Sequence, residues 1–456
     1  MKYIRFLIRR FLVKIKIKNM ERSNNLAGYL ITIYNFVLFK KFGRLLILCL
    51  LLVESFQVFF YIKDIFILYF FSKIIVPCLA CFIFSLYLFS AYLKNKIRKI
   101  DLWIFVVFIF LVFSSVINSY IYYQQPLWLG ITAQLKLFSI FIFFLLRYMF
   151  TLLKVDIKDL ENTILFLGLF SSVMFIIINL MLNPMNYWHE GSFLVKYSGV
   201  KGYYFKFPMK IFAQMCLYYY LFKILRGSKN LKDFLFITVV IIALFIYVKQ
   251  RMFLFFVVIG IFISIFINIK DNFVKIFLSI VFLFFVFIII KYALTPGNYI
   301  SIYNHSMLIR INTSLTILEI LKKEPVRLFL GSGNLSPLNR ITYQYLYGQN
   351  FWVSDVGIIG LMFEFGIVGL IFLYSLLIIL YLKSKKITKR SPLILQALKV
   401  NVLLELLSLP INVGIAYSIG IYMSYLAIFD FFERYGEYNT KSFKNVFLRK
   451  WKKITK

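Results

Sequence analysis

The chain has 456 residues, of which 62% are apolar and only 16% are charged, and its mean hydropathy is +0.84. This composition excludes a soluble globular protein. Lys and Arg number 53 against 18 Asp and Glu, a formal net charge of +35. In a soluble protein that excess would suggest nucleic acid, but in a chain with repeated apolar runs the positive-inside rule explains it. We therefore expect no nucleic-acid partner.

The first 44 residues are basic and are predicted to stay on one side of a membrane. Residues 1–22 contain eight Lys and Arg against one acid, Glu21, and their apolar stretches are too short for a secretory signal peptide. They are typical of an amphipathic segment on an anionic lipid surface. The stretch 26–39 is short for a span and ends in a basic cluster at 40–44. Residues 1–44 therefore form a predicted cytoplasmic tail with an interfacial helix.

Apolar segments long enough to cross a bilayer then follow one another as far as residue 431. They number about 12 by the hydropathy criterion. The predicted spans are 45–62, 65–93, 101–121, 129–153, 162–182, 207–225, 232–248, 252–269, 273–293, 356–382, 393–411 and 413–431. The predicted fold class is an all-α integral membrane protein.

The connectors between these spans alternate in charge, as a fixed orientation requires. Basic residues concentrate in the connectors 94–99, 226–232 and 383–390, and the tail 432–456 adds eight more. The positive-inside rule places all four segments on the cytoplasmic side. We expect one membrane domain, 45–431, with both termini in the cytoplasm.

Two connectors on the opposite face are long, 183–206 and 294–355. Long loops in a compact bundle commonly carry function. The second has a helical pattern from Arg310 to Glu324, which Pro325 ends. We expect this helix to lie on the outer membrane surface because its apolar residues share one face. The residues of that predicted face are Ile311, Leu315, Leu318 and Leu321.

The sequence offers little for metal or nucleotide chemistry. His189 and His305 lie in the long loops, where each is either an acid–base group or an exposed residue. The four cysteines all lie in predicted spans, and packing explains the Cys78-x-x-Cys81 pair better than a metal or redox site. P-loop, G-x-S-x-G and dinucleotide motifs are absent, which disfavours an ATP-driven machine. We expect no metal and no cofactor.

Basic residues persist in the predicted external loops, where the positive-inside rule should deplete them. Next to aromatic residues that stack on sugar rings, they suit an anionic ligand such as a lipid-linked pyrophosphate glycan, although contact with lipid headgroups is the alternative. Arg251, in the tight external turn Lys249-Gln250-Arg251, is flanked by apolar spans, so it either binds phosphate or snorkels to the interface. The other binding candidates are Lys201, Arg310 and Arg340.

Two carboxylates mark the span at 356–382. Asp355 lies at its outer entrance, and Glu364 follows about 13 Å further along a helix. Upstream, residues 331–334 read Gly-Ser-Gly-Asn and predict a flexible turn. Four glycines give this span a small-residue surface for close packing. They are Gly357, Gly360, Gly366 and Gly369.

In their order, these residues resemble the C-terminal half of the O-antigen polymerase (Wzy-type) and O-antigen ligase superfamily of membrane glycosyltransferases. That half has an external Arg, an amphipathic helix, a Pro, a G-x-G turn and a polar residue that opens a span with E-x-G-x-x-G. The matching residues here are Arg310, the 311–323 helix, Pro325, Gly331 and Gly333, Asp355, and Glu364 to Gly369. The resemblance covers residues 245–372 by motif, and the rest only by span count and the two long loops.

Two departures bear on the position within the superfamily. Ligases carry a His-Asn pair nine residues before the glutamate, whereas this chain has Asp355-Val356, which resembles the polymerases. Lys249-Gln250-Arg251-Met252 replaces the family's usual Ser-Arg-Gly step.

The resemblance implies a metal-independent glycosyltransferase at the outer face of the bacterial cytoplasmic membrane. It would transfer a growing glycan from undecaprenyl pyrophosphate to a lipid-linked repeat unit, as in the synthesis of lipopolysaccharide O-antigen, capsule or exopolysaccharide. Its partners would be the bilayer, the lipid-linked oligosaccharide and a chain-length regulator protein. The implied base is Asp355, with Glu364 as the alternative. The implied pyrophosphate-binding residues are Arg251, Arg310, Arg340, Lys249 and Lys201.

Two other classes stay open. A ligase would use the same chemistry with lipid A core as acceptor. A polysaccharide flippase or another transporter would also have about a dozen spans and would place charges inside them. The same charges suit paired residues of the bundle or snorkelling side chains. The residues concerned are Glu54, Lys73, Lys136, Arg147, Lys399 and Glu405.

Overall fold

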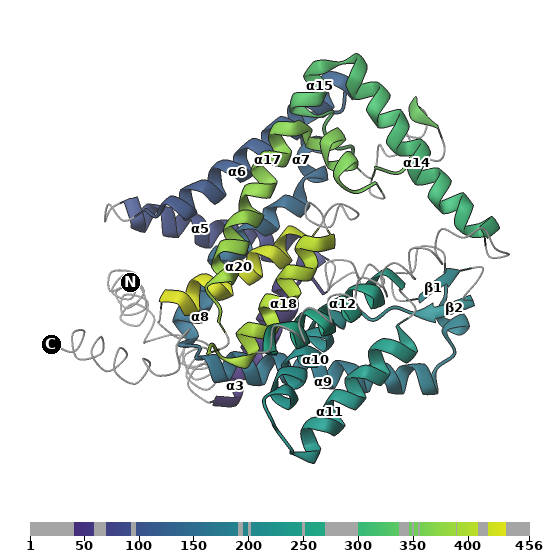
Figure 1. Cartoon of the computed structure of the whole chain (residues 1–456). Coiled ribbons are helices and arrows are strands. Elements are labelled where there is room, and N and C mark those ends of the chain that lie inside the picture. The colour runs from purple at the N-terminus through teal and green to yellow at the C-terminus, as the bar shows by residue number, and fades with distance from the viewer. Residues whose placement is uncertain are drawn as a thin grey trace, which may run out of the picture. The chain divides into compact units, whose positions relative to one another are not determined.

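The structure is a computed structural model, and most of the chain between residues 41 and 434 is described in it. The described residues are 41–58, 70–92, 97–189, 195–198, 202–248, 251–269, 300–336, 346–348, 351–353, 356–388, 390–408 and 418–434. The chain divides into two compact units, 1–51 and 52–456, and every site discussed below lies in the second. Figure 1 shows that the described part is almost entirely helical, which confirms the predicted all-α class.

The α-helices are α3 (Lys41–Ser55), α5 (Val76–Tyr92), α6 (Lys99–Tyr123), α7 (Leu127–Ala133), α8 (Ile142–Leu153), α9 (Ile157–Met181), α10 (Lys210–Leu225), α11 (Leu231–Ile241), α12 (Arg251–Asn268), α14 (Ile300–Lys323), α15 (Pro325–Leu330), α17 (Gly357–Lys385), α18 (Leu393–Ser408) and α20 (Ile419–Arg434). Tighter or wider helical turns form η1 (Phe71–Ile75), η2 (Leu135–Phe141), η3 (Pro184–Tyr187) and η4 (Ile242–Tyr247).

Five described helical segments are long and apolar enough to cross a membrane. They are Phe71–Phe89, Lys99–Tyr123, Leu135–Leu153, Ile157–Met181 and Gly357–Lys385. Each coincides with a predicted span, whereas the total of about 12 stays a prediction, and the span at 273–293 lies outside the described residues.

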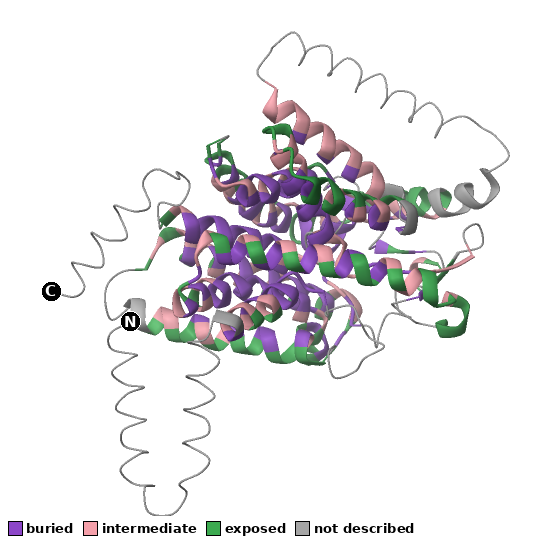
Figure 2. Ribbon diagram, turned by 90° about the horizontal axis from the view of Figure 1, so that it is seen from below, coloured by how far each residue is buried: buried purple, intermediate pink, exposed green. Residues whose placement is uncertain are grey.

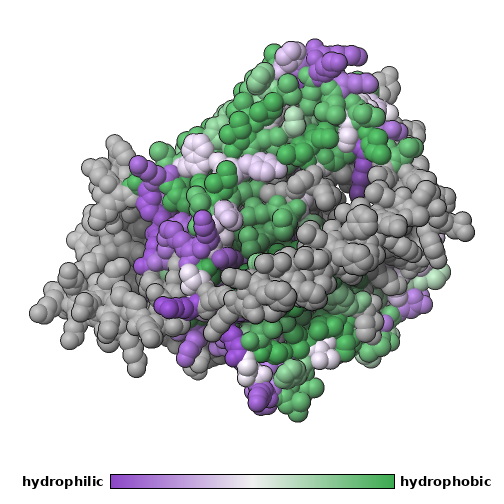
Figure 3. Space-filling view, viewed as in Figure 1, coloured by the Kyte–Doolittle hydropathy of each residue, from purple (hydrophilic) through white to green (hydrophobic). Residues whose placement is uncertain are grey.

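Large apolar side chains cover much of the described surface (Figure 3). Leu180 and Met181 at the end of α9 are 70% and 77% exposed, and Phe113 on α6 is 57% exposed. The buried residues lie on the inward faces of the same helices (Figure 2). Apolar patches of this extent are rare on soluble monomers and suit contact with lipid.

Local sequence determines where several helices begin. The side chain of Asp156 accepts the backbone N–H of Asp159 at 2.7 Å, and Asp159 returns the interaction, which forms the capping box of α9. Asn230 caps α11 by accepting the N–H of Lys232. Pro325 is the first residue of α15, where its missing N–H leaves no hydrogen bond unmade.

The buried carboxylates Asp101 and Asp430 join the ends of α6, α17 and α20 to the middle of α8, and we call this region the charged end. Asp101 lies 2.6 Å from Arg98 and 2.9 Å from Arg147. Asp430 lies 3.1 Å from both Arg98 and Lys383, and 3.4 Å from Arg147. Arg147, one of the charges expected inside a span, is therefore a paired charge of the bundle.

Helix α14 covers the predicted surface helix, but its apolar residues are divided between two sides. Ile317 and Leu321 are buried against a cluster that includes Phe363 of α17. An exposed stripe runs along the other side, and its members are Leu308, Ile311, Leu315 and Leu318. The prediction that Leu321 belongs to that stripe was wrong, because Leu321 lies about 40° around the helix from Ile317 and about 60° from Leu318.

The predicted external loop 183–206 contains an antiparallel hairpin that was not predicted. Strand β1 (Val195–Ser198) pairs with β2 (Gly202–Phe205), and the rings of Tyr197 and Tyr203 lie 4.8 Å apart. Strands of four residues are too short to give a clear alternating pattern in a sequence.

Candidate functional site

Helix α17 is broken at Gly366. This residue has φ +68° and ψ −178° inside the helix, a conformation that L side chains rarely adopt. A Cβ atom there would lie 2.2 Å from the carbonyl oxygen of Phe329 in α15. Gly366 therefore permits both the break and the close approach of α15.

The segment 331–336, which we call the glycine loop, supplies hydrogen bonds that the break removes from α17. The N–H of Ser332 donates to the carbonyl of Phe363 at 2.6 Å, and the N–H of Gly333 donates to the carbonyl of Glu364 at 3.1 Å. Non-helical backbone at membrane depth is tolerated only when its polar groups are paired in this way.

Both glycines of the loop have conformations and neighbours that exclude a side chain. Gly331 has φ +81°, and a Cβ atom would lie 2.5 Å from the carbonyl oxygen of Glu364. Gly333 has φ +80°, and a Cβ atom would lie 2.4 Å from the carbonyl oxygen of Ser115 in α6. The G-x-G turn therefore packs its backbone directly against two helices.

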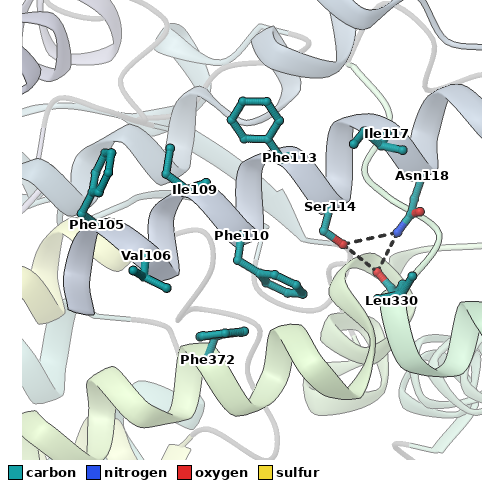
Figure 4. Close-up of a pocket in the computed structure, with 10 residues that line it drawn as sticks. All are labelled: Phe105, Val106, Ile109, Phe110, Phe113, Ser114, Ile117, Asn118, Leu330 and Phe372. Atoms are coloured by element: carbon teal, nitrogen blue, oxygen red, sulfur yellow. Dashed lines mark hydrogen bonds between the residues drawn. The ribbon is translucent and has the colours of Figure 1, made fainter. Parts of the chain in front are cut away.

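Helix α6 contributes a polar face to this contact. Asn118 Nδ2 and Ser114 Oγ donate to the carbonyl of Leu330 at 2.7 and 3.1 Å (Figure 4). The N–H of Asn334 donates to Ser115 Oγ at 3.1 Å. Since a bilayer offers no water to these groups, the hydroxyls and the amide of α6 hold the loop in the membrane domain.

Gln125, in the turn after α6, binds the far end of the glycine loop. Its Oε1 accepts the N–H of Ser336 at 2.8 Å, and its Nε2 donates to the carbonyl of Asn334 at 3.2 Å. The side chain is 1% exposed. The loop is thus bound at both ends by side chains from one helix and its following turn.

Behind the loop, Lys136 and Glu364 form a buried ion pair. Nζ of Lys136, in η2, lies 3.3 Å from Oε2 of Glu364, and the two side chains are 8% and 2% exposed. Lys136, one of the charges expected inside a span, is therefore paired with Glu364, the alternative candidate for the base. A buried and paired carboxylate suits positioning of the glycine loop better than contact with a bulky substrate.

Arg327 of α15 occupies an aromatic site next to the loop. Its guanidinium carbon lies 3.9 Å from the ring centroid of Tyr122, and Nη1 donates to the hydroxyl of Tyr347 at 3.2 Å. Nε lies 2.8 Å from Glu324 Oε2, an ion pair without the angle of a hydrogen bond. Burial alone would lower the pKa of Arg327, but Tyr347, Tyr123 and Glu324 hold it above its ordinary value, so the guanidinium stays charged.

An apolar groove of about 540 Å³ runs between α6 and α17 (Figure 4). Ser114, Asn118 and Leu330 line its polar end, where the glycine loop begins. The remaining lining residues are all apolar, namely Phe105, Val106, Ile109, Phe110, Phe113, Ile117 and Phe372. The groove is therefore apolar along most of its length and has hydrogen-bonding groups at one end.

The charged end and the glycine loop are separated by nearly one bilayer thickness. Along α6, Asn118 follows Asp101 by about 26 Å, and along the part of α17 after the break, Lys383 follows Ile367 by about 24 Å, at 1.5 Å per residue. The hydrocarbon core of a bilayer is about 30 Å thick. The residues of α6 that line the groove, from Phe105 to Asn118, span about 20 Å, which exceeds the depth of one leaflet, about 15 Å.

The arrangement of the predicted site residues stays a prediction, because most of their side chains lie outside the described residues. Arg310 is exposed on α14, and Arg251 is the first residue of α12, where its side chain is not described. Glu364 lies at the helix break. Four candidates lie outside the described residues, namely Lys201, Lys249, Arg340 and Asp355.

The polar face of α6 was not predicted as part of a site. Its signal is the run Ser114-Ser115-Val116-Ile117-Asn118-Ser119 in an otherwise apolar span. Polar side chains at membrane depth that cannot reach water must pair inside the bundle, so the run could have indicated a buried contact.

Comparison with known proteins gives no family assignment. The sequence matches no protein-family model, and no curated protein or solved structure matches it.

Proposed function

We propose that the chain is a membrane glycosyltransferase that acts on glycans carried by an isoprenoid pyrophosphate. The observation that carries this proposal is the apolar groove that ends at the polar glycine loop. A lipid-linked donor has the same division, because a long apolar chain is joined to a charged and hydroxylated headgroup. In this proposal the groove holds part of the isoprenoid chain and the loop lies near the headgroup.

The proposed orientation puts the glycine loop in the outer part of the membrane domain, on the side opposite the charged end. The basic connectors 94–99 and 383–390 flank the charged end, which the positive-inside rule assigns to the cytoplasm. Both termini are then cytoplasmic. The exposed apolar stripe of α14, which includes Leu315, would rest on the outer leaflet.

The chemistry requires neither a nucleotide nor a metal, because the energy of transfer is stored in the sugar–phosphate bond of the donor. The protein would stabilise the leaving pyrophosphate and accept a proton from the acceptor hydroxyl. Asp355 remains the proposed base. Pyrophosphate binding remains proposed for Arg251, Arg310, Arg340, Lys249 and Lys201.

Glu364 has a different role in this proposal. Its carboxylate is buried against Lys136, and its carbonyl binds the N–H of Gly333. We infer that the Lys136–Glu364 pair is a positioning element that keeps the glycine loop against the break in α17. Asp355-Val356, at the place where ligases carry His-Asn, favours a repeat-unit polymerase over a ligase.

The reaction class is tested with purified protein in nanodiscs, supplied with lipid-linked repeat units in EDTA and without nucleotide. Growth of a glycan ladder is the expected result, and its absence with an intact folded protein would refute the proposal. Arg310→Ala and Arg251→Ala should leave single repeats at unchanged protein abundance, and Asp355→Asn should abolish growth. Normal ladders in all three variants would reject the assigned site.

A flippase or another transporter is the second candidate, and the broken helix α17 favours it. Discontinuous helices with buried charges near the break, such as Lys136 and Glu364, are a feature of transporter binding sites. Proteoliposomes separate the two functions: a transporter moves unaltered lipid-linked oligosaccharide between leaflets, whereas a polymerase lengthens the glycan.

A further inference from the structure

Helix α3 ends inside the predicted membrane domain, at Ser55. The chain then turns through residues 56–58, and Gln57 has φ +57°, an uncommon conformation for a non-glycine residue. The carbonyl of Ser55 accepts a hydrogen bond from Ser424 Oγ in α20 at 2.9 Å. Because Ser424 precedes Asp430 by about 9 Å along that helix, the end of α3 lies well inside the apolar depth of the bundle.

Four buried side-chain oxygens at this helix end have no hydrogen-bond partner. They are Oε2 of Glu54, Oγ of Ser55, Oε1 of Gln57 and Oγ of Ser72. The four residues are 8%, 1%, 3% and 3% exposed, respectively. The hydroxyl of Ser72 lies next to the Glu54 carboxyl group. Buried polar atoms are usually paired, so four unpaired oxygens within two short segments require an explanation.

The Glu54 carboxylate is also without a positive partner among the described residues. An ionised carboxylate in an apolar interior is unstable unless a cation compensates it. The carbonyl ends of α3 add further negative potential at this point. Both effects favour a bound cation.

The unpaired amide oxygen and one hydroxyl are held in place by the surrounding structure. Gln57 Nε2 donates to Ser139 Oγ at 2.9 Å, which orients the side chain amide. Gly420 of α20 lies so close that a Cβ atom would be 2.9 Å from Gln57 Cδ. Ser72 lies in the π-helical turn η1, a feature that is frequent at functional sites.

We propose that Glu54, Ser55, Gln57 and Ser72 form a binding site for a monovalent metal cation, for which Na⁺ is the probe. Carboxylate, amide and hydroxyl oxygens are the ligands of hard cations. One carboxylate supplies one negative charge, so a monovalent ion leaves the site neutral, whereas a divalent ion would leave a positive charge in apolar surroundings. This site is separate from the groove and does not depend on the proposed transferase activity.

Binding of ²²Na⁺ to the purified full-length protein in detergent tests the proposal. We expect saturable binding that unlabelled NaCl displaces and choline chloride does not. Glu54→Gln should abolish binding, and Ser72→Ala, which keeps the charge, should weaken it at least tenfold. Glu405→Gln is the matched control, since the Glu405 carboxylate already accepts a hydrogen bond from Tyr422, and this variant should bind like the wild type.

Thermal stability provides a readout that needs no isotope. At constant ionic strength, replacing choline with Na⁺ should raise the melting temperature of the wild type and of Glu405→Gln, but not that of Glu54→Gln. If Glu54 instead carries a proton, the melting temperature will not respond to Na⁺ and no saturable ²²Na⁺ binding will appear, and either result overturns the proposal. Unchanged binding in Ser72→Ala overturns the assigned ligand set even if Glu54→Gln fails to fold.

Discussion

Asp101 and Asp430 lie on helices far apart in the chain, and both carboxylates contact the guanidinium of Arg147, at 2.9 and 3.4 Å. The three side chains are buried or nearly so, and the Arg147 guanidinium also lies over the ring of Phe143 at 4.8 Å. This contact joins α6, α8 and α20 at the charged end. Lys383 of α17 lies 3.1 Å from Asp430, so both helices that line the groove, α6 and α17, meet at this end.

Replacing Arg147 with Met should destabilise the fold strongly, because it removes a shared counter-charge from two buried carboxylates. We expect a loss of about 3–5 kcal/mol in the free energy of unfolding. Arg434→Met is the control: Arg434 lies 2.9 Å from Asp430 but is 38% exposed, so its loss should amount to at most about 1 kcal/mol. Unfolding in a denaturing detergent measures both. Equal losses for the two variants would contradict the role given to Arg147.

Glu433 should make the charged end sensitive to acid. Burial alone would raise its pKa, but Lys383, at 2.5 Å, and Lys386 hold it below its ordinary value. The unfolded chain therefore takes up the proton at a higher pH than the folded protein. The stabilisation is complete above the unfolded pKa and disappears as pH falls through the folded pKa. When melting temperatures are measured at decreasing pH, the melting temperature of Glu433→Gln should fall less steeply than that of the wild type. Glu319 is exposed, and Glu319→Gln should follow the wild type. Parallel curves for wild type and Glu433→Gln would refute this assignment.

Hydropathy and charge alone were sufficient to predict the helical class and the positions of the five long spans. Both depend on the hydropathy of about 20 consecutive residues, so a short stretch of sequence is enough to predict them. The break at Gly366 was not predicted, because a glycine within an apolar span equally indicates close helix packing. Only the contact with Phe329, 37 residues earlier, distinguishes the two interpretations.

The partner of Glu364 also could not be read from the sequence. Lys136 lies 228 residues away, and the two charges fall in separate predicted spans. Which helices are neighbours in the bundle depends on their packing, and no short stretch of sequence indicates it. The assignment of Glu364 as an alternative base stays untested, as does that of Asp355, which lies outside the described residues.

The glycine loop should not tolerate a side chain at Gly331. Gly331→Ala combines a positive φ with a Cβ atom 2.5 Å from the Glu364 carbonyl, so it should disrupt the loop and abolish activity. Gly227→Ala is the matched control, because Gly227 has φ +92° but a Cβ atom there meets nothing within 4 Å. It should lose only about 1 kcal/mol of stability through backbone strain. Melting temperature and glycan growth are measured for both, and an active, stable Gly331→Ala protein would show that the loop does not pack as described.

Filling the groove should weaken the binding of a lipid-linked substrate. Ile117→Trp puts a bulky ring into the groove next to Asn118 without changing charge. Ile177→Trp places the same ring on α9, at a similarly exposed position that does not line this groove. The dissociation constant of an isoprenoid pyrophosphate is measured for both variants. We expect Ile117→Trp to bind at least tenfold more weakly than the wild type and Ile177→Trp to bind like the wild type. Equal affinities would remove the groove from the substrate site.

The Lys136–Glu364 pair distinguishes a positioning role from a catalytic one. Lys136→Met removes the positive charge 3.3 Å from the buried Glu364 carboxylate and should cost about 3–5 kcal/mol. Glu364→Gln removes the carboxylate that lies 3.3 Å from Lys136 and should also destabilise the protein, but the double variant should recover part of the loss because neither charge of the pair remains. If the pair only positions the glycine loop, glycan growth will follow stability and return in the double variant. If Glu364 is the base, Glu364→Gln and the double variant will both be inactive at temperatures where they are folded, whereas Lys136→Met will keep measurable activity. Growth assays on all three variants below their melting temperatures separate these outcomes.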